Sequence, residues 1–145
     1  MKLIIIIITI GFSVLGSRLP AGKAEAASNE KESFFVAQKA FQDGFYEVSL
    51  GLFERFLNNY PVSEKSAQAR LFISQCYFHQ HRYLDALNQL ERLDSMPDSK
   101  AIKDALWYWI GEVHFRGNSF SKAQEYYRKI INQFPQSSYL AASYY

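Results

Sequence analysis

The feature that most constrains this chain is a set of residue columns that recur every 37 positions. Phe41, Phe78 and Phe115 form one aromatic column. Three more columns, one aromatic, one of small residues and one aliphatic, keep the same step: Tyr46, Tyr83 and Phe120; Ala37, Ser74 and Gly111; Val36, Ile73 and Ile110. A fixed period of this length predicts supersecondary units that stack, because a single unit cannot bury its own apolar face.

The third unit follows a known helical pattern most closely. Its marked positions are Trp107, Ile110, Gly111, His114, Ala123, Tyr127 and Pro135. Their order resembles the consensus of the tetratricopeptide repeat, Trp-x2-Leu-Gly-x2-Tyr, then Ala-x3-Phe, then Pro, with His114 as the weakest match. The resemblance implies an all-α fold, a right-handed superhelical solenoid of antiparallel helix hairpins with a period of 37.

The first two units keep the pattern more loosely. Ser33 and Arg70 stand in the Trp column, while Pro61 closes the first unit in register and Pro97 closes the second one residue early. The predicted organisation is therefore three repeats within residues 27–140, about 30–66, 67–103 and 104–140. We expect residues 141–145 to begin a fourth repeat that the sequence cuts short.

The predicted helices cover roughly 30–43, 46–59, 64–80, 83–95, 99–116 and 120–133, with another start at 138, and nothing in the sequence suggests a strand. The hairpin turns are expected to use residues that tolerate positive φ, namely Gly44, Gly117 and Asn118. Residues near the prolines are expected to cap the next helix, namely Ser63, Asp98 and Ser137.

The N-terminus has the pattern of a secretory signal peptide covering residues 1–26. A positive start is followed by an apolar run from Leu3 to Gly16 and by a small-residue cleavage site at Ala24–Ala27. The run is short for a membrane span, which needs roughly 20 apolar residues. We therefore expect export to the periplasm, with membrane attachment only if the segment stays uncleaved.

No lipid anchor and no nucleic-acid partner are expected. Val14–Ser17 resembles a lipobox, but Ser17 stands where the lipidated Cys would be. Without residues 1–26 the chain keeps 13 basic and 13 acidic residues, so the mature protein is neutral. A neutral protein lacks the positive field that attracts nucleic acid.

The ends of two repeats point to a subclass. Tyr60-Pro61-Val62-Ser63 and Phe134-Pro135-Gln136-Ser137 share an aromatic-Pro-x-Ser ending. This ending resembles the long-repeat proteins of Gram-negative envelopes, namely the outer-membrane β-barrel assembly lipoprotein (BamD-like) and the Tol-Pal-associated division coordinator. The chain departs from the first by its missing lipidated Cys and from the second because no heptad segment precedes Glu30.

The resemblance implies peptide binding on a concave face lined by the first helix of each repeat. Helical spacing assigns nine groove positions, which are Phe34, Gln38, Gln42, Leu71, Gln75, His79, Tyr108, Glu112 and Arg116. Polar residues at four-residue steps beside an aromatic suit a bound peptide, although a merely solvated face would show a similar pattern. The Lys and Asn pattern of relatives that grip a C-terminal carboxylate is absent.

No catalytic, cofactor or metal site is predicted. Cys76 is the only cysteine, so it cannot form an intramolecular disulfide and is expected to be a buried apolar residue. His79 and His81 are two residues apart and point to different sides of a helix, which makes them a poor chelate. His114 is expected to pack in the Tyr column.

The leading hypothesis is a non-catalytic scaffold or adaptor of the bacterial cell envelope. It would bind peptide segments of other envelope proteins in the groove, in outer-membrane biogenesis or cell division. The alternative is an accessory substrate-binding domain of a larger envelope enzyme, such as a peptidoglycan hydrolase. Sequence beyond Tyr145 would separate the two, and the oligomeric state is left open.

Overall fold

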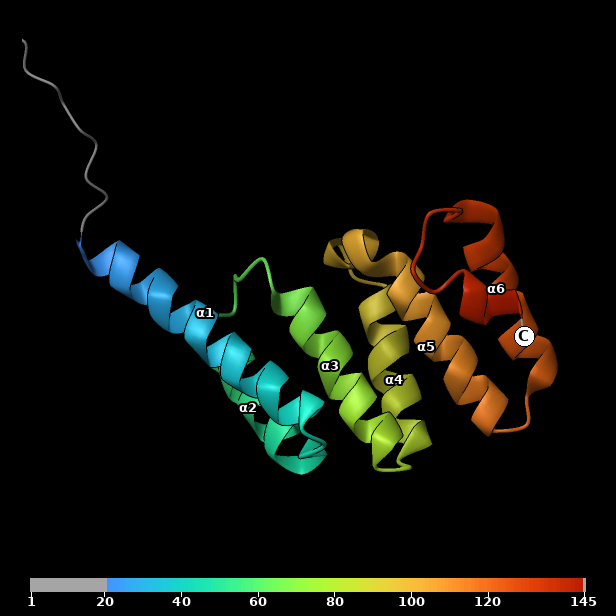
Figure 1. Ribbon diagram of the computed structural model, residues 1–145, viewed down its shortest axis with the longest axis horizontal. Coiled ribbons are helices and arrows are strands. Elements are labelled where there is room, and N and C mark those ends of the chain that lie inside the picture. Colours follow the sequence, from blue (N-terminus) through green and yellow to red (C-terminus); the bar gives the residue numbers. More distant parts are fainter. Residues whose placement is uncertain (1–20, 145) are drawn as a thin grey trace, which may run out of the picture.

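The computed structural model describes residues 21–144 of the chain, with side chains from residue 25. Within that range there is no strand, and six α-helices follow one another (Figure 1). They are α1 (Ala21–Gln42), α2 (Tyr46–Asn59), α3 (Ser66–His79), α4 (Tyr83–Asp94), α5 (Lys103–Arg116) and α6 (Phe120–Gln133), with 3₁₀-helices η1 (Pro97–Ile102) and η2 (Ala141–Tyr144).

The helices pack as three consecutive hairpins, which confirms the prediction of an all-α stack of helix pairs. Each helix contacts the next along the chain, and the stack runs from α1 at one end to α6 at the other (Figure 1). The first helices of neighbouring hairpins also meet, α1 with α3 and α3 with α5, more than the second helices do. The side formed by α1, α3 and α5 is therefore the inner side of the stack, and we call it the concave face.

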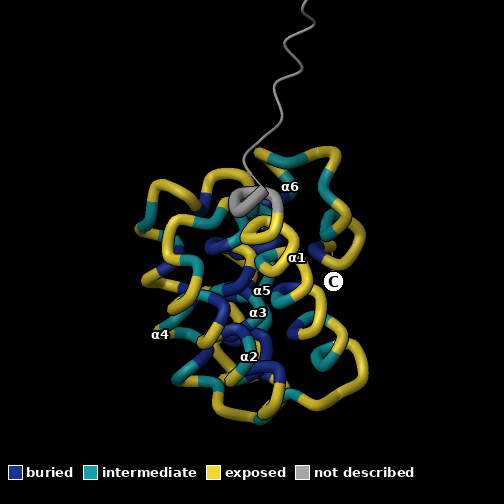
Figure 2. The backbone as a smooth tube through the Cα atoms, turned by 90° about the vertical axis from the view of Figure 1, so that its left-hand side faces the viewer, coloured by how far each residue is buried: buried dark blue, intermediate teal, exposed yellow. Residues whose placement is uncertain are grey.

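The core consists of two clusters, one at each junction between hairpins. Phe34, Phe53 and Ile73 belong to the cluster that joins the first hairpin to α3. Leu90 and Leu106 belong to the cluster that joins the second hairpin to α5. In a view onto the α1 end, the buried segments lie between the helices and the exposed ones outside (Figure 2). Burying one such side chain contributes about 1.5–3 kcal/mol, so the junctions stabilise the stack.

The column of small residues sets how closely the two helices of a hairpin approach. Ala37 and Ser74 are almost fully buried. At Gly111 a Cβ atom would lie 2.5 Å from Cε1 of Tyr127 on the opposite helix, much closer than two carbon atoms can pack. Gly111 is therefore required by the close approach of α5 to the Tyr127 ring.

Each hairpin turn contains one residue with positive φ, and these residues are again 37 apart. Gly44 has φ 82°, His81 has φ 59° and Asn118 has φ 58°. The prediction was right for Gly44 and Asn118. Gly117 also lies in a hairpin turn, as predicted, although its φ is −83°, and the prediction missed His81.

The serine of each aromatic-Pro-x-Ser ending bonds to a carboxylate near the start of the same repeat. The Ser63 hydroxyl donates to Oε1 of Glu30 over 2.6 Å and accepts from the Lys65 N–H over 3.0 Å. Ser137 makes the same pair of bonds with Asp104 and Tyr139. These serines bond to the turn before the next helix, without capping that helix itself, and join the turn to a residue at the start of their own repeat.

The second repeat ends differently from the other two, and the prediction for Asp98 was wrong. Neither η1 nor α5 has a side-chain cap, and the Ser99 hydroxyl instead donates to the Met96 carbonyl. Nζ of Lys103 lies 2.6 Å from Oδ1 of Asp94, which anchors the start of α5 to the end of α4. The polar contacts at this junction thus replace the Ser–carboxylate tie.

Two helix starts differ from those predicted by four residues or more. The expected helix over 99–116 is split, because η1 fills the first part and α5 begins only at Lys103. Helix α1 begins at Ala21, nine residues early, so the expected cleavage site at Ala24–Ala27 lies within it. The apolar run Leu3–Gly16 and Ser17 lie outside the described residues. None of the described helices is long and apolar enough to cross a membrane.

Candidate functional site

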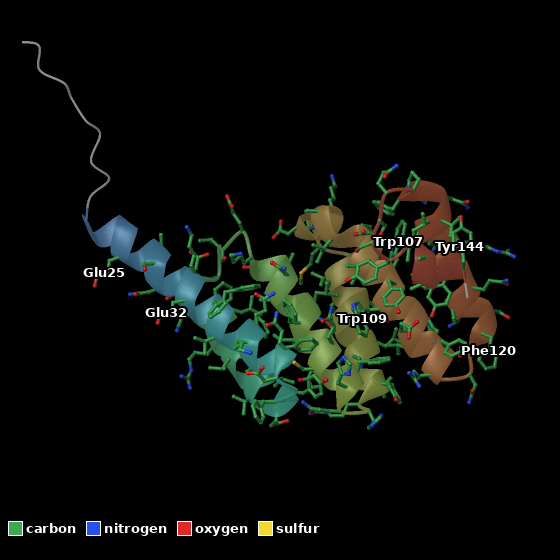
Figure 3. The ribbon with its side chains drawn as sticks, viewed as in Figure 1. Glu25, Glu32, Trp107, Trp109, Phe120 and Tyr144 are labelled. Carbon is green, nitrogen blue, oxygen red and sulfur yellow. The ribbon has the colours of Figure 1, made fainter. Side chains whose placement is uncertain are left out.

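His79 marks the centre of the concave face, because its ring contacts aromatic side chains of all three hairpins. It stacks on Tyr46 of the first hairpin with ring centroids 4.5 Å apart and planes inclined by 7°. It meets Phe41 at 5.6 Å and Trp109, on α5, at 5.9 Å, both edge to face. Trp109 lies in the region between α3 and α5 (Figure 3).

The aromatic surroundings of His79 also influence its charge. Burial lowers the pKa of the imidazole below its ordinary value of 6.5, and the nearby His81 lowers it further. A neutral imidazole is therefore favoured near neutral pH, where one ring nitrogen donates and the other accepts. Since the residue is still exposed, this pair of polar atoms is available to a ligand at the middle of the face.

The nine predicted groove residues fall into three groups. Gln42, His79 and Arg116, at the last turn of each first helix, are exposed. Three more are half-buried, namely Gln38, Tyr108 and Glu112. The remaining three are buried, with exposed fractions of 4% for Phe34, 6% for Leu71 and 7% for Gln75.

The prediction was wrong for Phe34, Leu71 and Gln75, because all three side chains are buried, the first two of them in the hydrophobic core. Phe34 packs edge to face against Phe53 and Phe56 of α2, at 5.4 and 5.3 Å. Leu71 belongs to the core cluster of the second junction. The physical reason is the rotation of each first helix about its axis, which turns this column toward the second helices.

A second aromatic column stands one position later. Its members are Phe35, Phe72 and Trp109, and they too repeat every 37 residues. Phe72 stacks on Phe53 at 4.9 Å, and Trp109 meets Phe78 edge to face at 5.2 Å, so each packs on the preceding hairpin. Phe35 is 63% exposed. The 37-residue spacing of this column was visible in the sequence and could have identified it.

Tyr108 and Glu112 take part in a network that holds α5, α6 and the following turn together. The Tyr127 hydroxyl donates to Oε1 of Glu112 over 2.8 Å. Tyr108 stacks on Tyr139 with centroids 4.7 Å apart. Burial, together with Glu112, raises the pKa of Tyr127, so its hydroxyl keeps its proton and remains a donor. These two predicted groove residues are therefore engaged within the fold.

The remaining chemistry of the described residues is limited. No group of three or more His, Cys, Asp or Glu side chains within residues 21–144 is placed to hold a metal ion. Cys76 is fully buried, as predicted, and burial raises its thiol pKa to about 11. A thiol with that pKa is almost entirely protonated near pH 7 and is a poor nucleophile.

Comparison with protein families gives two matches. A family model described as Tetratricopeptide repeat matches residues 37–99, and a second model with the same description matches residues 104–137. The second match covers the third hairpin, α5 and α6, and the first runs from within α1 to η1. No curated protein matched the chain.

Proposed function

The chain is a tetratricopeptide repeat protein, and from this premise we propose that it is a non-catalytic scaffold of the bacterial cell envelope that binds peptide segments of partner proteins on its concave face. Repeats of this family generally act as protein-binding scaffolds. The observation that carries the proposal is the row of exposed polar residues at the last turns of the first helices, Gln42, His79 and Arg116.

The row offers two kinds of contact to a peptide. Amide, imidazole and guanidinium groups can bond the backbone of an extended segment. The aromatic column beside it, from the exposed Phe35 to the half-buried Trp109, offers apolar surface. Charges on this face have both signs, so we expect partners chosen by side-chain shape and hydrogen bonding more than by net charge.

The envelope location and the subclass rest on sequence features. The signal-peptide pattern of residues 1–26 supports export, and the aromatic-Pro-x-Ser endings support kinship with the envelope subclass of long repeats. A role in outer-membrane biogenesis or cell division follows from that kinship. The Ser–carboxylate ties at Ser63 and Ser137 supply a physical reason for keeping the ending.

Site-specific photo-crosslinking tests this proposal. A photoreactive amino acid is placed at Gln42 or Arg116 on the concave face, and at Asn88, an exposed residue of α4, as the matched control. We expect Gln42 and Arg116 to crosslink the same partner, recovered from the envelope fraction, and Asn88 to give none. Equal crosslinking from Asn88 would refute the concave site, and a cytoplasmic partner would refute the envelope assignment.

A further inference from the structure

A hollow of about 330 Å³ lies between α1 and α2, lined by residues other than the nine predicted groove positions. Ser33 and Val36 line it from α1, and Leu52, Arg55 and the buried Phe56 line it from α2. Its volume is near the lower end of the range for ligand pockets, which is roughly 300–1,000 Å³. The hollow therefore suits a single ring better than a large ligand.

The repeat explains why the first hairpin has this hollow. Ser33 stands 74 residues before Trp107, in the same column, so a small hydroxyl side chain takes the place of an indole. Trp107 lies half-buried on α5 (Figure 3), edge to face with Phe134 at 5.6 Å, and Nζ of Lys129 lies 5.9 Å from its ring centroid. Its Nε1–H donates to Oδ1 of Asp94 over 3.2 Å. The third hairpin thus shows how an indole packs at this position.

The first hairpin keeps the side chains that surround the indole in the third. Arg55 lines the hollow in the column of Lys129, so a cation again stands beside the ring position. Tyr60 stands in the column of Phe134 and packs on Phe56 with ring centroids 5.3 Å apart. A cation over a ring face and a neighbouring aromatic edge both stabilise a bound ring. The hollow is therefore a formed site for an aromatic ring.

The charged groups that line the hollow favour one kind of ring. Glu32, on α1 (Figure 3), and Arg55 are both exposed and line it. A carboxylate only accepts hydrogen bonds, so Glu32 suits a ring with an N–H, as Asp94 suits Trp107. Among aromatic side chains, Trp gives the strongest contact with a cation and also carries such a donor. Both charges therefore indicate an indole.

The amide side chains that line the hollow indicate where the indole comes from. Asn29 and Asn59 are exposed and line it. An amide group both donates and accepts, which matches the N–H and C=O groups of a peptide backbone. A free amino acid would carry a charged ammonium and carboxylate in place of those peptide groups. The ligand that fits these amides is a tryptophan within a polypeptide.

We propose that the hollow between α1 and α2 binds a tryptophan side chain of a partner polypeptide. The indole takes the place that Trp107 has in the third hairpin, with Arg55 over its face and Glu32 accepting from its N–H. Asn29 and Asn59 bond the adjacent main chain. This site is separate from the concave face.

N-acetyl-tryptophanamide is the probe, because it carries the indole and two peptide groups without a charge. Binding to the 145-residue chain is followed through the backbone amide signals in a nuclear magnetic resonance titration. A single side chain binds weakly, so we expect a dissociation constant of about 1 mM, with the largest shifts at Ser33, Val36 and Arg55. The N-methylindole analogue has no N–H and is expected to bind about threefold more weakly.

Ser33→Trp tests the site from within the chain. It is expected to abolish binding of the probe and to raise the midpoint of urea unfolding, because the added indole fills the hollow. Gln68→Trp, at an exposed residue of α3, is the matched control and should leave binding unchanged. Arg55→Ala is expected to weaken binding about threefold while the helical circular dichroism stays the same.

Three results would overturn the proposal. The first is binding of the probe that both Ser33→Trp and Arg55→Ala leave unchanged. The second is a titration to several times the expected dissociation constant that shifts no signal at the hollow. The third is free tryptophan binding about tenfold more tightly than the probe, since the ligand would then be an amino acid. The crosslinking at Gln42 and Arg116 reports on the concave face and is independent of these results.

Discussion

His81 is the residue least suited to the conformation it adopts. It has φ 59° at the position that Gly44 and Asn118 hold in the other turns. An L-residue with a Cβ pays roughly 1–2 kcal/mol for the left-handed region, whereas Gly and Asn enter it readily. The hydrogen bond between Nδ1 of His81 and the Tyr83 hydroxyl, 2.9 Å long, offsets part of this cost.

We predict that His81→Gly raises the free energy of unfolding by about 0.5–1 kcal/mol, because it relieves the strain at positive φ. Thermal unfolding followed by circular dichroism measures the change. Gly44→Ala is the reverse test. Nothing lies within 4 Å of the Cβ it would add, so its expected loss of stability reports backbone strain alone. A stabilising Gly44→Ala would contradict the argument.

The role of a repeated position was predictable from the sequence where the residue type itself indicates a backbone requirement, such as a positive φ. The residue types at Gly44 and Asn118 predicted turns with positive φ, whereas His81 in the same column gave no such indication. The groove assignment failed at Phe34 and Leu71 because hydrophobicity alone does not distinguish a core aromatic from a surface one on the same helix. Only the contacts of Phe34 with α2 fix the rotation of α1.

At the scale of elements, the helices with the strongest columns were predicted best. Residues 46–59 and 120–133 match α2 and α6 at both ends. The early start of α1 follows from the alanine-rich stretch after Ala21, which matches a cleavage-site pattern but also favours helix. The start of α5 at Lys103 depends on the bond of its ammonium group to the Asp94 carbonyl at the end of α4, nine residues away, which the helical pattern does not contain.

The Ser63 tie is expected to be worth about 1–2 kcal/mol, because it joins a capping bond to a bond with a carboxylate. Ser63→Ala removes both, and should lower the midpoint of urea unfolding. Val62→Ala is the matched control. The Val62 side chain, next to Ser63, is 95% exposed, so this substitution should leave the stability unchanged. The double variant Ser63→Ala with Glu30→Ala should lose less stability than the sum of the two single variants. Full additivity would show that the hydrogen bond between Ser63 and Glu30 does not contribute.

At the scale of the whole molecule, the two ends of the stack differ in polarity. The outer face of α1 carries the charges of Glu32 and Lys39 on either side of the exposed Val36, while Phe115 and Phe120 leave the α6 face aromatic. A solenoid needs a polar face wherever its stacking stops. The charges on α1 therefore suit contact with water, and the aromatic rings on α6 suit contact with another helix.

The stability of the molecule should fall when the pH drops from about 7.5 to 5.5. Burial lowers the pKa of His79 and of His114, with His81 and Lys122 adding to the effect. The unfolded chain, whose histidines titrate near 6.5, then binds more protons than the folded one in this range. Stability contributed by the neutral rings is present above that value and is lost as the pH falls through the folded pKa.

We therefore predict that replacing His114, which stacks on Tyr126, by Phe reduces the pH dependence while preserving the fold. Urea unfolding at pH 7.5, 6.5 and 5.5 measures it. The variant should lose less stability across the series than the unmodified chain. An identical loss in both would show that His114 does not contribute.

Cys76, on α3, packs toward α2 with its side chain buried. The fate of this thiol therefore depends on whether the chain folds before or after it meets an oxidant. In any oxidising medium, folding and oxidation compete for the same sulfur atom. A chain that folds first keeps the thiol reduced, because no oxidant reaches it. A chain that is oxidised first carries an added group that the junction cannot accommodate, so the speed of folding decides how much protein becomes usable.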